Sequence, residues 1–267
     1  MLPFAVTAVS ELRTNWLTVV TWAFSLYISV SFACVIWYAV REARAGQLLQ
    51  SPHSPAKFIL PPWFWQALLL GIFSIFFFPP LFFVIVPMLA VLISSEKDST
   101  GLWGVDRFSV GGLAKWSLLY CGAVIFVEIP LADWSENFFT VLLKQFNLSN
   151  PEQATVEAFK SYHRWKDIVF FLLQAVILSP ILEEIFFRGF LFTYLKSHTS
   201  ILLAAVLSAG VFAFAHVNLG SVIPLWFLGV ALALAYQNTG SLLLPICVHG
   251  LFNLLTGLSL LIDKGNS

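Results

Sequence analysis

Long apolar runs constrain this chain more strongly than any other feature of its sequence. Each extends over 17 or more residues, enough for a helix to cross a hydrocarbon core about 30 Å thick. Only 10% of the residues are charged, against about a quarter in a soluble domain. The runs lie at 16–40, 63–93, 113–131, 167–195, 200–217, 221–237 and 241–262. We therefore predict an all-α fold, a polytopic transmembrane helical bundle in the lipid bilayer.

The number of spans depends on the run at 63–93, which is too long for one straight helix across a bilayer. Pro79 and Pro80 interrupt it, and proline breaks the helical hydrogen-bond ladder. One kinked helix gives seven spans, and two segments that meet at the prolines give eight. We expect residues 1–267 to form a single integral membrane domain of about seven or eight spans.

Charge and cysteine content exclude other classes of protein. The net charge is zero, so no basic surface indicates a nucleic-acid partner. Cys34, Cys121 and Cys247 lie in apolar stretches at unrelated spacings. They form neither a disulfide framework nor a CxxC metal set.

The region between the spans at 113–131 and 167–195 is more polar. We expect a long connection over 132–166, with a short helix at 151–165 that lies on the membrane surface. Glu128 and Asp133 lie near the end of the preceding span, so we expect them at the membrane interface. The spans that follow are joined by short connections, which predicts an antiparallel four-helix core over 166–262.

Three charged residues interrupt the apolar run at 167–195, in the segment "SPILEEIFFRGF". Each such charge at the centre of a membrane helix is unfavourable by about 2.5–3.5 kcal/mol. Glu184 and Arg188 are four residues apart in the order that favours an ion pair on one helix face. Glu183 lies 100° away around the helix and has no such partner. Pro180 predicts a helix distortion just before this cluster.

Further polar residues lie in the later spans. His216 ends "AGVFAFAH", and His249 and Asn253 share one helix face in "HGLFN". At 1.5 Å per residue, Glu183, His216, His249 and Asn253 have depths that agree within roughly 10 Å. We therefore expect them to converge on one buried polar site.

This set of residues permits two kinds of hydrolytic chemistry. A glutamate and a histidine can activate a water that attacks a carbonyl, while a second histidine and an asparagine amide donate to the oxyanion. Alternatively, Glu183, His216 and His249 could hold zinc with an open fourth position.

The same residues could also have no catalytic role. Glu184 and Arg188 could form an ion pair that only fixes helix packing, and His216 could lie at the membrane interface. His249 and Asn253 could hold helices together by hydrogen bonds.

The ordered motifs Glu183-Glu184-x-x-x-Arg188, Phe212-x-x-x-His216 and His249-x-x-x-Asn253 resemble those of the CPBP family. These are the CAAX-processing and bacteriocin-processing (Abi) intramembrane endopeptidases. The resemblance covers about the last hundred residues.

The resemblance implies that Glu183 and His216 activate water and that His249 and Asn253 form the oxyanion site. It also implies that Glu184 and Arg188 support the site. The family has been described both as glutamate-dependent hydrolases and as metalloproteases. We favour no cofactor, with zinc on Glu183, His216 and His249 as the alternative. The expected substrate is a membrane-associated protein or peptide, cleaved near the interface of a bacterial-type plasma membrane.

Two other functions compete with proteolysis. A non-proteolytic membrane scaffold or bacteriocin-immunity protein could use the same cavity, and it should tolerate Glu183→Gln. A proton-coupled transporter could also use intramembrane acids and histidines. The sequence shows no inverted repeats of the kind that many transporters contain.

Overall fold

The computed structural model describes residues 108–148 and 154–266, and this part of the chain is helical, without strands. The predicted all-α fold is thus confirmed for the described residues. The predicted spans at 16–40 and 63–93 lie outside them, so the count of seven or eight stays a prediction. Four described helical segments are long and apolar enough to cross a membrane. They are Val110–Gln145, Trp165–His198, Val222–Thr239 and Leu243–Lys264.

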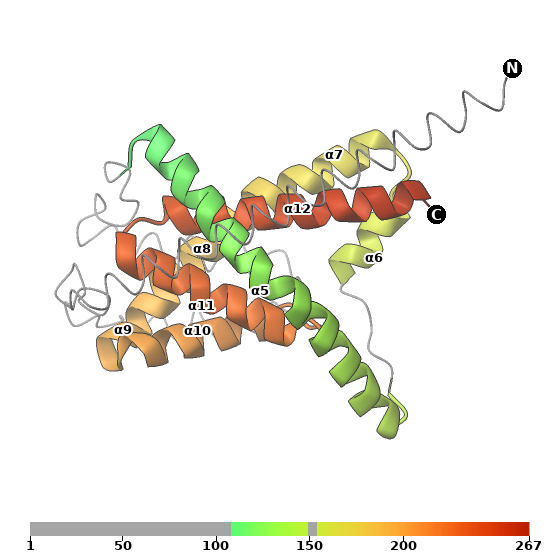
Figure 1. Cartoon of the computed structure of the whole chain (residues 1–267), viewed down its shortest axis with the longest axis horizontal. Coiled ribbons are helices and arrows are strands. Elements are labelled where there is room, and N and C mark those ends of the chain that lie inside the picture. Colours follow the sequence, from blue (N-terminus) through green and yellow to red (C-terminus); the bar gives the residue numbers. More distant parts are fainter. Residues whose placement is uncertain (1–107, 149–153, 267) are drawn as a thin grey trace, which may run out of the picture.

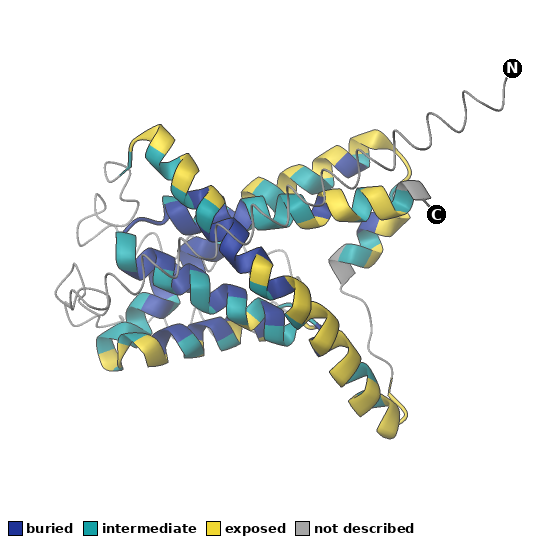
Figure 2. Cartoon of the chain, viewed as in Figure 1, coloured by how far each residue is buried: buried dark blue, intermediate teal, exposed yellow. Residues whose placement is uncertain are grey.

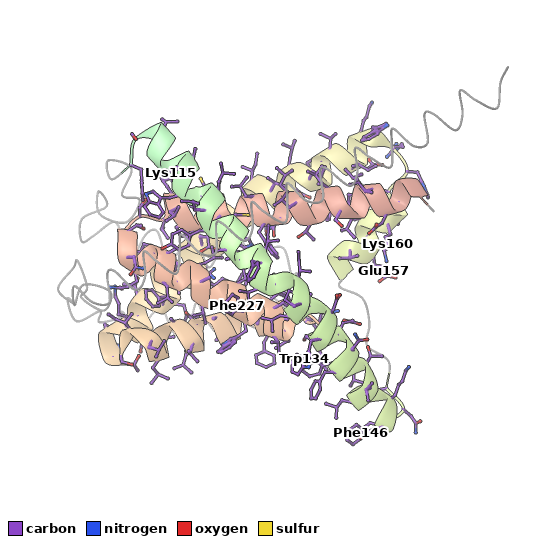
Figure 3. All side chains as sticks on the ribbon, in the orientation of Figure 1. Lys115, Trp134, Phe146, Glu157, Lys160 and Phe227 are labelled. Carbon is purple, nitrogen blue, oxygen red and sulfur yellow. The ribbon has the colours of Figure 1, made fainter. Side chains whose placement is uncertain are left out.

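Helix α5 (Val110–Gln145) has 36 residues and is about 54 Å long. Ser109 caps its first turn by accepting a hydrogen bond from the Gly112 N–H. The helix crosses α11 and α12, and its second half stands away from the bundle (Figure 1). This half is largely exposed (Figure 2), and Trp134 and Phe146 are labelled on it in Figure 3.

The predicted end of this span at residue 131 was therefore wrong, as was the connection from 132 to 145. The helix passes through Pro130 and continues because the following sequence is amphipathic. Five of the polar residues in this sequence, including all the charged ones, fall within an arc of about 100° on one side of the helix. They are Asp133, Glu136, Asn137, Thr140 and Lys144. A search for uniformly apolar segments does not detect such a helix.

The predicted surface helix is present but shorter than expected. Helix α6 spans Ala154–Ser161, and α7 (Trp165–Leu173) begins four residues later. The Lys264 ammonium, near the end of α12, donates to the carbonyls of Lys160 (3.0 Å) and Tyr162. Phe159 also packs on Phe171, with 5.1 Å between ring centroids. These contacts hold α6 against α7 and the end of α12.

The predicted span at 167–195 is confirmed as a helical segment that runs from Trp165 to His198. Its hydrogen-bond pattern changes along its length. After α7, a π-helical segment η2 (Gln174–Leu178) precedes α8 (Ser179–Glu184), and a second, η3 (Ile185–Phe192), precedes α9 (Thr193–His198). Pro180 has no N–H and its ring excludes the carbonyl of Val176, which explains a shifted ladder at η2.

At its start, this segment is anchored by an exposed ion pair. Arg164 donates to the Asp167 carboxylate at 2.9 Å. That carboxylate raises the pKa of the Arg164 guanidinium.

The last three helices are α10 (Ile201–Ala215), α11 (Val222–Thr239) and α12 (Leu243–Asn266). The predicted spans at 221–237 and 241–262 are confirmed by α11 and α12. Helix α10 is shorter than the predicted span at 200–217, because it ends at Ala215. Its 15 residues are about 22 Å long, less than the thickness of the hydrocarbon core.

Small residues allow these helices to approach closely. The alanines at 205, 209 and 213 are buried, as their spacing predicts for a packing face. A Cβ on Gly229 of α11 would lie 2.8 Å from the Ala209 Cβ. A Cβ on Gly250 of α12 would lie 2.6 Å from the Val176 carbonyl oxygen in η2. These two contacts bring the polar residues of α10, α11 and α12 close to the charged segment of α8 and η3.

Candidate active site

Glu184 and Arg188 form the ion pair that the sequence predicts. Arg188 Nη1 donates to Glu184 Oε1 at 2.6 Å, and both side chains are fully buried. Arg188 Nη2 donates to the Gly229 carbonyl at 3.1 Å, and the guanidinium lies 4.7 Å from the Phe212 ring centroid. Arg188 therefore ties η3 to α11 and α10 as well as neutralising Glu184.

His249 lies between the two glutamates. Its Nδ1 is 2.8 Å from Glu184 Oε1, and its Nε2 is 3.9 Å from Glu183 Oε2. Because the Glu184 oxygen already accepts from Arg188, His249 Nδ1 is the donor in this contact. Glu184 thus fixes both the orientation and the tautomer of His249. The sequence did not predict this contact, since 65 residues separate the two side chains and no spacing rule connects them.

Glu183 has a different environment from its neighbour. The Ser179 hydroxyl donates to Glu183 Oε1, which fixes the carboxylate. Glu183 Oε2 is buried and has no hydrogen-bond partner among the described residues. Sequence reasoning missed Ser179, although its position four residues before Glu183 on a helix was the available signal.

His216 is the C-terminal cap of α10. Its Nδ1 lies 2.8 Å from the Phe212 carbonyl oxygen, which can only accept, so Nδ1 carries the hydrogen. In the neutral ring, Nε2 is then free to accept a proton. The Phe212 ring lies 4.8 Å from the His216 ring and 5.7 Å from the His249 ring, centroid to centroid. Phe212 thus packs against both histidines.

Asn253 is held by the π-helical segment η2. Its Nδ2 donates to the Ala175 carbonyl at 2.8 Å, across 78 residues of sequence. This bond uses one of the two amide hydrogens. Asn253 and His216 are half-buried, whereas Glu183 and His249 are buried, so Asn253 and His216 are the more accessible members of the set.

The alternative zinc site is not assembled in this structure. Among the described residues, no three His, Cys, Asp or Glu side chains lie close enough together to hold a metal ion. Glu183 and His249 approach each other, with 3.9 Å between Oε2 and Nε2. The Nδ1 of His216 is engaged with the Phe212 carbonyl, which leaves its Nε2 as the ring nitrogen that could bind a metal.

Glu128 is buried against a neighbouring helix. Only 5% of it is exposed, and its carboxyl interacts with the backbone of Leu228 in α11. Its predicted place at the membrane interface stays a prediction, but the helix end at residue 131 from which it was inferred is not observed, because α5 continues to Gln145. Asp133, five residues further on, is exposed.

Comparison with known proteins supports the family predicted from the motifs. Residues 165–255 match the model of the type II CAAX prenyl endopeptidase Rce1-like family. The matched segment contains all six predicted site residues. No solved structure matches the chain with significance.

Two curated relatives are similar to parts of the chain. A Bacillus subtilis protein named "Putative membrane peptidase YdiL" is 25% identical over 165 residues, which is 61% of this chain. The membrane-embedded CAAX protease MroQ of Staphylococcus aureus is 37% identical over 95 residues, or 33% of this chain. The matches span 58% and 38% of the lengths of these two relatives. Residues 165–255 are therefore similar to the CPBP family of CAAX-processing membrane endopeptidases, in agreement with the motifs.

Proposed function

We propose that this protein is an intramembrane endopeptidase that hydrolyses peptide bonds of membrane-associated proteins or peptides near the membrane interface. The observation that carries the proposal is Glu183 Oε2, a buried carboxylate oxygen that has no hydrogen-bond partner in the described part of the chain and lies 3.9 Å from His249 Nε2. Unpaired acids inside a membrane protein usually mark function. The names of the family and of the two relatives, which refer to CAAX proteolysis and membrane peptidases, point to the same activity.

In the proposed reaction, Glu183 is the general base. Oε2 accepts a proton from water while the water oxygen forms a bond to the carbonyl carbon of the substrate. His216 Nε2 accepts a hydrogen bond from the same water and orients it. Glu183 then returns the proton to the leaving nitrogen as the C–N bond breaks, which yields a carboxylic acid and an amine. The acid afterwards loses its proton to solvent and becomes the carboxylate product. Ser179 holds Oε1, so Oε2 is the oxygen left for this exchange.

The proposed oxyanion site uses His249 and Asn253. The second amide hydrogen of Asn253 is not needed by Ala175 and is available to the oxyanion. His249 can donate from Nε2 when both ring nitrogens carry hydrogen, while its Nδ1 stays bonded to Glu184. A single donor of this kind contributes about 2.7–4 kcal/mol to transition-state stabilisation. Glu184 and Arg188 are positioning residues in this scheme.

We propose residues 166–262 as the catalytic core and the plasma membrane of a bacterial-type cell as its location. The proposed reaction requires no cofactor. Whether the activity depends on a metal can be measured from the zinc content of the purified protein and its activity after chelation. Stoichiometric zinc in the purified protein, lost together with activity on chelation, would overturn the metal-free scheme.

The test is cleavage by the purified protein in lipid nanodiscs containing ¹⁸O-labelled water. The probes are fluorescent peptides that end in a Cys-aliphatic-aliphatic-Met sequence, with and without farnesylation of the cysteine. We expect a new C-terminal carboxylate that carries one ¹⁸O, detected by mass spectrometry. Glu183→Gln should abolish it, whereas Asp133→Asn, the same change at an exposed acid on α5, should not. Retained cleavage by Glu183→Gln would contradict the proposal.

A further inference from the structure

Three helices in the described part of the chain end with a residue in the left-handed backbone region. Helix α11 ends at Gly240 (φ 63°), α5 ends before Asn147 (φ 55°), and α10 ends before Val217 (φ 52°). Glycine and asparagine are the usual residues at such helix ends. Valine is unfavourable there, because a β-branched side chain crowds the backbone when φ is positive. Val217 is thus the strained member of the three.

The turn itself does not require valine. The Val217 N–H donates to the Phe214 carbonyl at 3.1 Å. At the end of α5, the Asn147 N–H donates to the Lys144 carbonyl at 3.2 Å in the same arrangement. An asparagine or glycine at position 217 could therefore form the same turn with less strain. Strained backbone of this kind is concentrated at functional sites.

Val217 lies directly after His216, at the accessible edge of the candidate site. It is 85% exposed, and the apolar residues Phe214 and Leu219 beside it in the sequence are 65% and 40% exposed. Glu183 is buried, while His216 is only half-buried. A peptide that approaches Glu183 past His216 would meet this apolar edge.

We propose that Val217 is a specificity-determining residue that contacts an apolar side chain of the peptide substrate next to the scissile bond. This inference rests on the proposed peptidase function. An apolar partner is indicated because the valine side chain neither donates nor accepts hydrogen bonds. The strained turn holds it immediately next to His216, in a fixed position relative to the water-activating group.

The first test is substrate selectivity of Val217→Gly and Val217→Asn. Both substitutions should raise the melting temperature, because they relieve the left-handed strain. Both should also lower kcat/KM about tenfold for a peptide with valine next to the cleaved bond, and much less for one with alanine there. Asn147→Gly, at the matching turn of α5, should change neither quantity. Unchanged selectivity in both Val217 variants would overturn the inference.

The second test separates this inference from the proposed function. The photoreactive residue p-benzoylphenylalanine replaces Val217 or, as a control, Asn147 in the Glu183→Gln background, and the farnesylated and unmodified Cys-aliphatic-aliphatic-Met peptides are the probes. We expect a peptide adduct at 217 that an excess of unlabelled peptide removes, and none at 147. An adduct at 217 without cleavage by the native protein would contradict the peptidase function alone. Cleavage without an adduct at 217, or with adducts to lipid only, would refute the role of Val217.

Discussion

Two buried acidic sites in the membrane-spanning helices differ in how their charge is compensated. In the segment that follows Trp165, Glu184 accepts from both Arg188 and His249. On α5, Glu128 is also buried, but its Oε1 has no hydrogen-bond partner within residues 108–148 and 154–266. Glu184 thus belongs to a network of contacts that holds several helices together, whereas Glu128 is a single carboxyl between α5 and α11. Substitutions in the network should therefore destabilise the protein far more than substitutions at Glu128.

The largest effect is expected for Arg188→Met. This change leaves Glu184 buried without its cation, and such losses lower the free energy of unfolding by about 3–5 kcal/mol. Unfolding of the detergent-solubilised protein by sodium dodecyl sulfate measures it. The double variant Arg188→Met/Glu184→Gln removes the uncompensated charge and should recover much of the loss. A double variant as unstable as the single one would show that Arg188 acts by packing instead.

A smaller effect is expected where the helices of the core cross. In Gly229→Ala, the new Cβ would lie 2.8 Å from the Ala209 Cβ, which forces α10 and α11 apart. We expect a loss of about 1–3 kcal/mol in the same unfolding assay. On α5, a Cβ at Gly111 meets nothing within 4 Å, so Gly111→Ala should be neutral or stabilising by up to about 1 kcal/mol. Equal losses at both positions would argue against tighter packing in the core.

The smallest effect is expected at Glu128. Glu128 has no counter-charge among the described residues, and glutamine keeps its shape, so Glu128→Gln should change stability by less than about 1 kcal/mol. The unfolding assay should show a gain or no change. A clear loss would show that the carboxyl itself stabilises the packing of α5 against α11.

The spacing of residues along the sequence predicted the contacts within one helix of the site. It could not predict the contacts between helices that are far apart in the sequence. The Glu184–Arg188 pair follows from a four-residue step on one helix face, and the structure confirms it. The contact of Glu184 with His249 depends on how α12 packs against α8, which Gly250 permits by its lack of a side chain. Pro180 predicted a distortion but not the π-helical form that it takes.

The sequence predicted the positions of those helices that long apolar runs alone make recognisable. The helices after Trp165 are predominantly apolar along their whole length, and the predicted spans correspond to them apart from the early end of α10. The second half of α5 was missed because its apolar residues recur with the helical period among polar ones. The burial of Glu128 was missed for the same reason, because its predicted place depended on where α5 ends.

The central claim is that two adjacent glutamates have different roles, with Glu183 in the reaction and Glu184 in the network that positions His249. Peptide cleavage and unfolding of Glu183→Gln and Glu184→Gln, measured side by side, test it most directly. The account predicts that Glu183→Gln loses at least about 100-fold in kcat with unchanged stability. It predicts that Glu184→Gln is destabilised by about 3 kcal/mol or more, because Arg188 then lacks its counter-charge. The claim would be contradicted if the two variants changed kcat and the free energy of unfolding equally. It would also be contradicted if Glu183→Gln lost stability and Glu184→Gln lost only activity.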